Sequence, residues 1–194
     1  MLDTHCRRYV QPIIGIGAKF FLKLGFTANG VTILAMLIGV SSGIFTYLGY
    51  NYIGVLVLWL SGYLDAVDGT IARETNSSSA FGTIMDITFD RMVEASVIIG
   101  VASRYRELSY SAMLLSISII ITMTIFLTTG SLTDKKSEKS FYYQAGLAER
   151  TEGFIMFSLI ILLKDKAEIM IYALTIMIII TILQRFLEAR KIVK

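Results

Sequence analysis

Long apolar stretches separated by short polar segments make up most of the chain. A helix needs about 20 apolar residues to cross the hydrocarbon core of a bilayer. Six stretches are candidates: residues 31–50, 52–67, 83–103, 109–130, 153–163 with its upstream flank, and 168–187. The second and fifth are short and border charged residues, which favours helices that open into an aqueous cavity. The pattern predicts an all-α integral membrane protein with six transmembrane helices over residues 29–187.

The first 25 residues have a different pattern, in which apolar positions recur at a helical period. Basic residues stand among them: Arg7, Arg8, Lys19 and Lys23. This predicts an N-terminal amphipathic juxtamembrane helix over residues 1–25. The helix can lie in the membrane interface with its basic residues toward anionic headgroups, or pack on the rest of the protein, and the two are compatible.

Composition supports this class. Of the 194 residues 55% are hydrophobic and 17% are charged, whereas soluble domains carry about 25% charged residues. The length predicts a single domain over residues 1–194. The net charge of +3 is small and scattered, which argues against a nucleic-acid partner. A G-x-x-x-G pair in the first span, Gly39 and Gly43, predicts close helix packing.

The distribution of Lys and Arg predicts the orientation. Both termini and the segments 68–82 and 131–152 can be placed on one side of the membrane. The other side then carries few basic residues: Arg104, Arg106, Lys164 and Lys166. Cytoplasmic loops hold the excess of Lys and Arg. We therefore expect both termini and the 68–82 segment in the cytoplasm.

Four aspartates interrupt the apolar pattern between residues 65 and 90, in DAVDGTIARETNSSSAFGTIMDITFD. Each carboxylate at the centre of a membrane helix costs about 2.5–3.5 kcal/mol. Asp65 and Asp68 have i,i+3 spacing, and Asp86 and Asp90 have i,i+4 spacing, so each pair shares one helix face. A helical hairpin brings all four together, and carboxylates so close need compensation.

Divalent cations provide that compensation, because carboxylate oxygens suit Mg²⁺ or Mn²⁺. Three or four carboxylates can hold two metal ions, which can clamp the oxygens of a phosphoryl displacement. Nearby small residues, Gly69, Ala72 and Gly82, leave space for a bulky ligand, and Arg73 supplies a bidentate donor for phosphate. The segment predicts a metal–diphosphate site.

The same segment resembles the signature of the CDP-alcohol phosphotransferase (CDP-alcohol phosphatidyltransferase) family. That signature is D-x-x-D-G-x-x-A-R, eight residues, then G-x-x-x-D-x-x-x-D, and residues 65–90 match all eight specified positions. Residues 24–32, LGFTANGVT, resemble the family's T-P-N-x-x-T sequence before the first span. Ala28 stands in place of the usual Pro, which we expect to loosen the turn. The resemblance covers most of the chain and includes six spans after a juxtamembrane helix.

The resemblance implies a role for each site residue. Asp65, Asp68 and Asp86 would bind metal, and Asp90 would be both a ligand and the general base. The CDP moiety would be held by Asn29, Gly30, Val31, Thr32, Gly69, Ala72, Arg73, Ser79 and Gly82. The reaction would transfer a phosphatidyl group from a CDP-alcohol such as CDP-diacylglycerol to a small alcohol, with release of CMP. The family also implies a homodimer among membrane lipids.

Two other classes explain the acids in part. Intramembrane prenyltransferases also hold a diphosphate through Mg²⁺ and Asp clusters, but they do not explain the G-x-x-A-R and Gly82 pattern. A cation transporter would place its acids deep in the spans, without an arginine among them. Metal-dependent release of CMP from CDP-diacylglycerol separates these classes.

The acceptor is less defined. The family branch that uses inositol phosphate has a Lys on the fourth span, E-R-x-E-R before the fifth, and Q-R near the end of the sixth. Gln184-Arg185 matches the last motif, but Gly153 replaces the second Arg of the middle one, and the fourth span ends LTTGSL without Lys. Inositol phosphate is therefore disfavoured, and glycerol 3-phosphate, serine or another small alcohol remains open.

Arg150 and Arg185 are the candidate acceptor contacts. Each also has a simpler interpretation: Arg150 as a positive-inside residue, and Arg185 as an interfacial anchor. Glu94, one turn beyond Asp90, can extend the row of acids or pair with Arg91.

Overall fold

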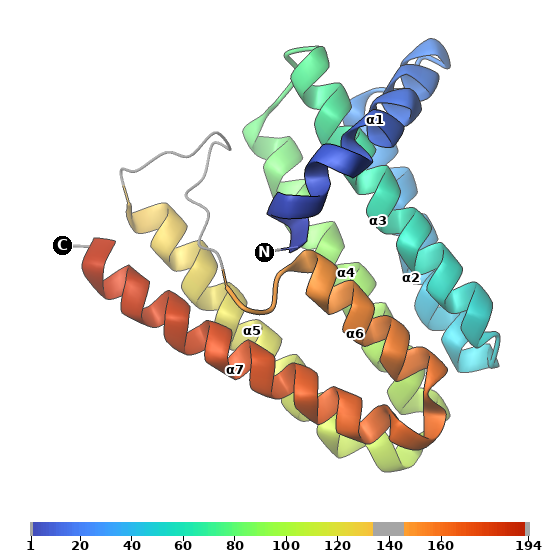
Figure 1. Ribbon diagram of the computed structural model, residues 1–194, viewed down its shortest axis with the longest axis vertical. Helices are drawn as coiled ribbons and strands as arrows, with labels where there is room; N and C mark the ends of the chain where they lie inside the picture. Colours follow the sequence, from blue (N-terminus) through green and yellow to red (C-terminus); the bar gives the residue numbers. More distant parts are fainter. Residues whose placement is uncertain (1, 134–145, 193–194) are drawn as a thin grey trace. The chain divides into compact units, whose positions relative to one another are not determined.

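The computed structural model describes residues 2–133 and 146–192, and within these ranges the chain forms helices and no strands (Figure 1). This confirms the predicted all-α class. The long helices are α1 Leu2–Lys23, α2 Ala28–Leu48, α3 Asn51–Glu74, α4 Ala80–Arg104, α5 Ser109–Leu132, α6 Arg150–Leu162 and α7 Ala167–Ile192. Two single turns, η1 Arg106–Leu108 and η2 Lys164–Lys166, precede α5 and α7.

Four helical segments in the described residues are long and apolar enough to cross a membrane. They are Ala28–Leu48, Asn51–Glu74, Arg106–Leu132 and Lys164–Ile192. The chain is thus a multi-pass membrane protein. α4 has 25 residues and carries the two later aspartates, whereas α6 has only 13 residues, or about 20 Å at the helical rise. The count of six spans therefore stays a prediction.

The chain divides into two compact units, and the first comprises Leu2–Arg106. In this unit α3 and α4 both pack against α2. Glycine makes the contact between α2 and α4 possible, because a Cβ on Gly43 would overlap the carbonyl of Ser96, and one on Gly100 would overlap the backbone of Gly43. The predicted packing role of the G-x-x-x-G pair is confirmed.

Hydroxyl groups fix the register of α2 against α3. The Ser42 hydroxyl donates to the carbonyl of Gly54 (2.8 Å), and the Ser61 hydroxyl donates to the carbonyl of Ala35 (2.8 Å). Interhelical bonds of this kind hold membrane helices together where the hydrophobic effect between them is weak. Asp65 therefore follows, by one turn of α3, a residue that is bonded to α2.

α1 packs across α3 in the same unit (Figure 1). The hydroxyl of Tyr63 donates to the carbonyl of Ile13 (3.0 Å). A Cβ on Gly17 would overlap that hydroxyl, so the close approach of α1 to Tyr63 requires glycine at this position. Ile14 and Ala18 are buried in a cluster with Val67, whereas several side chains between residues 10 and 23, such as Ile16 and Phe20, are exposed. Packing on the protein is thus observed, and a position of α1 in the membrane interface stays a prediction.

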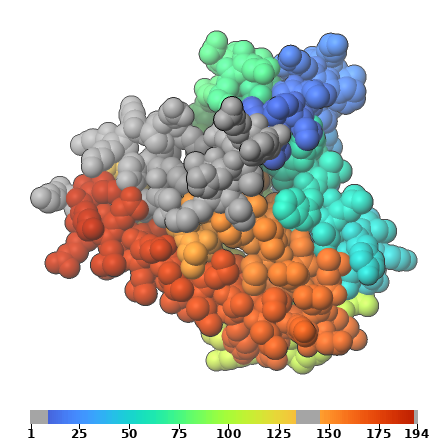
Figure 2. Space-filling view, in the orientation of Figure 1, coloured from blue at the N-terminus to red at the C-terminus, as the bar shows by residue number. Residues whose placement is uncertain are grey.

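The second unit begins at Glu107. Within it, α5 and α6 both pack against α7, and Figure 2 shows the side chains of α6 and α7 side by side. Part of the predicted loop 131–152, residues 134–145, lies outside the described residues. The single domain over residues 1–194 stays a prediction.

Candidate metal and nucleotide site

Three of the four aspartates meet where α3 ends and α4 begins. One carboxylate oxygen from each of Asp65, Asp68 and Asp86 lies within 4.8 Å of the others. Asp68 is only 6% exposed, and the other two are partly buried. Oxygens that bind one divalent cation lie about 2.0–2.6 Å from it and hence up to about 4–5 Å from each other. The spacing of these three carboxylates fits such an ion.

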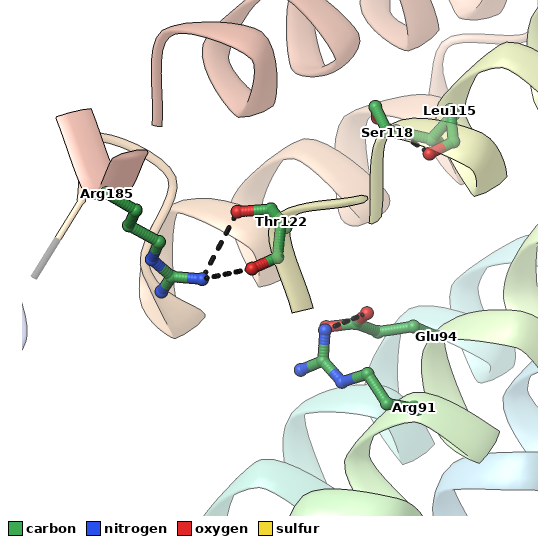
Figure 3. A network of polar contacts seen from close by, with 6 residues as sticks. All are labelled: Arg91, Glu94, Leu115, Ser118, Thr122 and Arg185. Carbon is green, nitrogen blue, oxygen red and sulfur yellow. Dashed lines mark hydrogen bonds and ion pairs between the residues drawn. The ribbon is translucent and has the colours of Figure 1, made fainter. Parts of the chain in front are cut away.

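Asp90 is outside this group of three. It lies one turn beyond Asp86 on α4 and is partly buried. Asp90 is thus close to the cluster along the helix, but it is not one of the three residues whose carboxylate oxygens lie within 4.8 Å of one another. Glu94, one turn further, pairs with Arg91 at 2.6 Å between Oε2 and Nη1 (Figure 3). Glu94 was expected either to extend the row of acids or to pair with Arg91, and the structure shows the ion pair with Arg91.

Two helix N-termini are capped in the same unit. The Thr27 hydroxyl accepts a hydrogen bond from the amide of Gly30 (3.1 Å) at the start of α2, and the Ser79 hydroxyl accepts one from the amide of Gly82 (3.0 Å) at the start of α4. The capping role of Thr27 was not predicted, although Thr before a helix is a common capping signal. This cap begins α2 at Ala28, where the family has Pro.

The start of α2 comes close to the start of α4. A Cβ on Gly82 would lie 3.2 Å from the Ser79 hydroxyl oxygen and 3.4 Å from Asn29 Oδ1. The structure thus brings together three residues of the predicted nucleotide set: Asn29, Ser79 and Gly82. Helix N-termini carry partial positive charge and bind phosphate readily, so this corner of the unit suits an anionic ligand.

The other predicted nucleotide residues differ in their surroundings. Val31 and Thr32 are buried, and the Thr32 hydroxyl donates to the carbonyl of Ala28. Ala72 packs against the cluster of α1, α2 and α3. Arg73 is exposed and donates from Nη2 to the Thr70 hydroxyl (3.0 Å). Of these four, Arg73 has the exposure and the charge that a phosphate contact needs.

Gly69 and Gly30 complete the predicted set. A Cβ on Gly69 would lie 3.4 Å from Arg73 Nη1, so the guanidinium lies over this glycine. Gly30 donates its amide to the Thr27 cap. Both glycines are partly buried.

The candidate acceptor residues lie in the second unit. Arg185 on α7 is 7% exposed, and its Nη1 donates to the hydroxyl (3.2 Å) and the carbonyl (3.4 Å) of Thr122 on α5 (Figure 3). Its guanidinium also lies 4.8 Å from the centroid of the Phe126 ring. The side chain of Arg185 is thus buried between α5 and α7, which argues against its alternative interpretation as an interfacial anchor.

Arg150 is the first residue of α6, where its guanidinium lies 5.8 Å from the Phe154 ring centroid. It is partly buried. At Gly153, one turn along α6, a Cβ would meet nothing within 4 Å. The position at which inositol-phosphate enzymes of the family carry a second Arg is thus open space in this chain.

The fold and the carboxylate cluster define a multi-pass membrane protein in which three clustered carboxylates lie in the same unit as two capped helix N-termini. The model of the CDP-alcohol phosphatidyltransferase family matches residues 26–186. The chain therefore belongs to the CDP-alcohol phosphatidyltransferase family, a family of metal-dependent transferases. The alternative classes, prenyltransferase and cation transporter, lie outside it.

Individual relatives agree with this assignment. The chain is 30% identical over 191 residues to the archaetidylinositol phosphate synthase of Pyrococcus horikoshii. The aligned region covers 98% of this chain and 97% of the relative. The fold of the present chain is similar to that of Mycobacterium tuberculosis phosphatidylinositol phosphate synthase in its crystal structure with CDP-DAG bound. That match has a TM-score of 0.78 at 22% identity and covers 92% of this chain and 94% of the other.

A second structure of the mycobacterial enzyme holds manganese and citrate. It matches with a TM-score of 0.75 at 22% identity and covers 90% of this chain and 88% of the other. The predicted cofactor class, Mg²⁺ or Mn²⁺, is confirmed by family membership together with the three-carboxylate cluster.

Proposed function

We propose that this protein transfers the substituted phosphate of a CDP-alcohol, such as CDP-diacylglycerol, to the hydroxyl of a small alcohol. One observation carries the proposal: three carboxylates, from Asp65, Asp68 and Asp86, converge in the unit that also holds the capped N-termini of α2 and α4. A dianionic diphosphate bridged by a divalent cation complements this arrangement of charges.

Each residue has a role in the proposed reaction. Asp65, Asp68 and Asp86 would hold Mg²⁺ or Mn²⁺, which neutralises diphosphate charge and polarises the reacting phosphate. Arg73, Asn29 and the N-termini of α2 and α4 bind and orient the nucleotide diphosphate. Asp90 accepts the proton of the acceptor hydroxyl. The acceptor oxygen then forms a bond to the β-phosphorus, and the bond to the CMP oxygen breaks, so that CMP leaves with the electron pair.

The membrane arrangement belongs to the same proposal. We place six spans in the bilayer, α1 at the interface, and both termini and the aspartate site in the cytoplasm, because Lys and Arg are concentrated on that side. A cysteine introduced at Ser77, an exposed residue of the α3–α4 connection, is expected to react with a membrane-impermeant maleimide only when the cytoplasmic face is accessible. Labelling from outside intact cells would contradict this orientation.

The partners include membrane lipids and a second copy of the chain. An interfacial site suits a CDP-alcohol with a soluble head and acyl tails, and the family implies a homodimer. A native mass that corresponds to one chain in a mild detergent would argue against the dimer.

Activity of the purified protein tests the proposed function. We expect release of CMP from CDP-diacylglycerol that depends on both Mg²⁺ or Mn²⁺ and an alcohol, measured with glycerol 3-phosphate, serine and inositol phosphate as separate acceptors. The absence of CMP release with all of these, and with other CDP-alcohols, would contradict the proposal.

The acceptor pocket differs from that of the inositol-phosphate branch. Arg150 and Arg185 remain as contacts for a phosphate or carboxylate on the acceptor, but Gly153 and the end of α5, residues 127–132, supply no further cation. The relative from Pyrococcus horikoshii is an archaetidylinositol phosphate synthase by name. We nevertheless propose that this chain prefers a smaller alcohol, because two cationic contacts are missing.

The variant Gly153→Arg tests this preference by restoring one contact. A Cβ at position 153 would meet nothing within 4 Å, and replacing a glycine of a helix with a better helix former favours that helix by up to about 1 kcal/mol. A charge-assisted hydrogen bond contributes about 1.5–3 kcal/mol, so we expect kcat/KM for inositol phosphate to rise about 10- to 100-fold. Gly153→Gln, of similar shape without charge, is the control. If the wild type uses inositol phosphate efficiently and Gly153→Arg has the same kcat/KM for it, the proposed preference for a smaller alcohol is contradicted.

A further inference from the structure

The peptide before α6 is held by side chains of α7. The amide of Leu147 donates to Gln184 Oε1 (3.0 Å), and the amide of Ala148 donates to the Thr181 hydroxyl (2.9 Å). Amides that precede a helix have no acceptor within that helix, and the N-cap residue Glu149 makes no side-chain capping bond. α7 therefore supplies the acceptors for this peptide.

The contact at Thr181 is close and directional. The Thr181 hydroxyl donates to the carbonyl of Met177 (2.9 Å) while it accepts from the amide of Ala148, so its proton and one of its two lone pairs are used. Thr181 is 1% exposed. At Gly146 a Cβ would overlap the methyl group of Thr181. The backbone at residues 146–148 thus lies directly against one side of α7.

These two contacts lie next to both candidate acceptor residues. Leu147 and Ala148 are three and two residues before Arg150, and Thr181 is one helical turn before Arg185 on α7. Arg185 is itself held by Thr122. Loss of the contacts would free the start of α6 to shift and would move Arg150 relative to Arg185.

We propose that Thr181 and Gln184 are positioning residues for the acceptor: they set the place of Arg150 relative to Arg185 and thereby the affinity for an anionic acceptor. The inference rests on the proposed function, in which these two arginines bind the acceptor. Thr181 and Gln184 act through Arg150 and need not touch the acceptor themselves.

Paired variants at each position test the proposal through Michaelis constants. Thr181→Val keeps the size and removes the accepting oxygen, whereas Thr181→Ser keeps that oxygen. We expect Thr181→Val to raise the KM of an anionic acceptor about 3- to 10-fold, the range for one hydrogen bond. The KM of the CDP-alcohol and kcat should stay within about twofold, and Thr181→Ser should resemble the wild type.

Gln184 gives the same test at an exposed position. Gln184→Met removes the acceptor, and Gln184→Glu keeps an oxygen in its place. We expect Gln184→Met to raise the KM of the anionic acceptor but not that of the CDP-alcohol, and Gln184→Glu to have a smaller effect. The Gln184 variants test the proposal if Thr181→Val does not fold. Equal rises in both Michaelis constants, or an unchanged acceptor KM in both Thr181→Val and Gln184→Met, would overturn the proposal.

A double-mutant cycle with Arg150 shows whether the effect passes through that residue. If it does, Thr181→Val adds little to the acceptor KM once Arg150→Ala is present. Independent, multiplicative effects would overturn the proposal.

Hydrogen exchange at the amides of Leu147 and Ala148 gives a readout without activity. We expect both amides to be protected in the wild type and the amide of Ala148 to lose its protection in Thr181→Val. Fast exchange of these amides in the wild type would show that the hydrogen bonds do not form. A protein that shows this protection but releases no CMP from any CDP-alcohol would instead defeat the proposed function.

Discussion

Asp90→Asn is expected to lower turnover by about 10²- to 10⁴-fold, the usual contribution of a general base. Binding of the CDP-alcohol should remain close to that of the wild type. Asp90 lies outside the group formed by Asp65, Asp68 and Asp86, so we expect the three carboxylates of the cluster to keep their arrangement in the variant. Asparagine keeps the size of the side chain and one oxygen but cannot accept the proton. Single-turnover kinetics and equilibrium binding of CDP-diacylglycerol measure the two effects separately.

A control for the loss of a carboxylate on α4 is Glu94→Gln. Glu94 is one turn beyond Asp90 and pairs with Arg91 (Figure 3), and we give it no part in the reaction. Near-normal turnover in Asp90→Asn would show that another group takes the proton. A parallel loss of nucleotide binding would show instead that Asp90 acts mainly as a metal ligand.

Removal of the divalent cation is expected to abolish activity, and addition of Mg²⁺ or Mn²⁺ should restore it. Asp68→Asn should weaken the binding of metal and nucleotide together, because Asp68 is the most buried member of the cluster. We expect a loss of metal affinity larger than the 10- to 100-fold that removal of an outer-shell partner causes. Activity measured against free metal concentration gives the affinity for each variant.

Asp165→Asn is the matched control for Asp68→Asn. Asp165 is an exposed aspartate in η2, and its loss should leave the metal dependence unchanged. Full activity of the wild type in excess chelator would contradict a metal-dependent mechanism.

The sequence predicted the aspartate cluster well because local periodicity determines it. Spacings of three and four residues place each pair on one helix face, and the short connection between α3 and α4 brings the two faces together. Spacing does not show how each helix is rotated against its neighbour. For this reason the sequence predicted a group of four acids, whereas the structure brings three of them within the distance of one cation.

Contacts between residues far apart in the chain were not predictable in the same way. Arg185 is buried because Thr122, 63 residues earlier, accepts its hydrogen bonds. A threonine within an apolar stretch gives no sign of its partner. The contact of Thr181 with Ala148 was missed for the same reason, whereas Gln184 was noticed only as part of a motif.

In the proposed function, the cluster of Asp65, Asp68 and Asp86 binds the cation that holds the CDP-alcohol. Electron paramagnetic resonance of Mn²⁺ titrated into the purified protein, with and without CDP-diacylglycerol, tests it most directly. We expect that the wild type binds Mn²⁺, that CDP-diacylglycerol tightens this binding, and that both effects are lost in Asp68→Asn but kept in Asp165→Asn. Equal Mn²⁺ binding by the wild type and Asp68→Asn, unaffected by CDP-diacylglycerol, would contradict it.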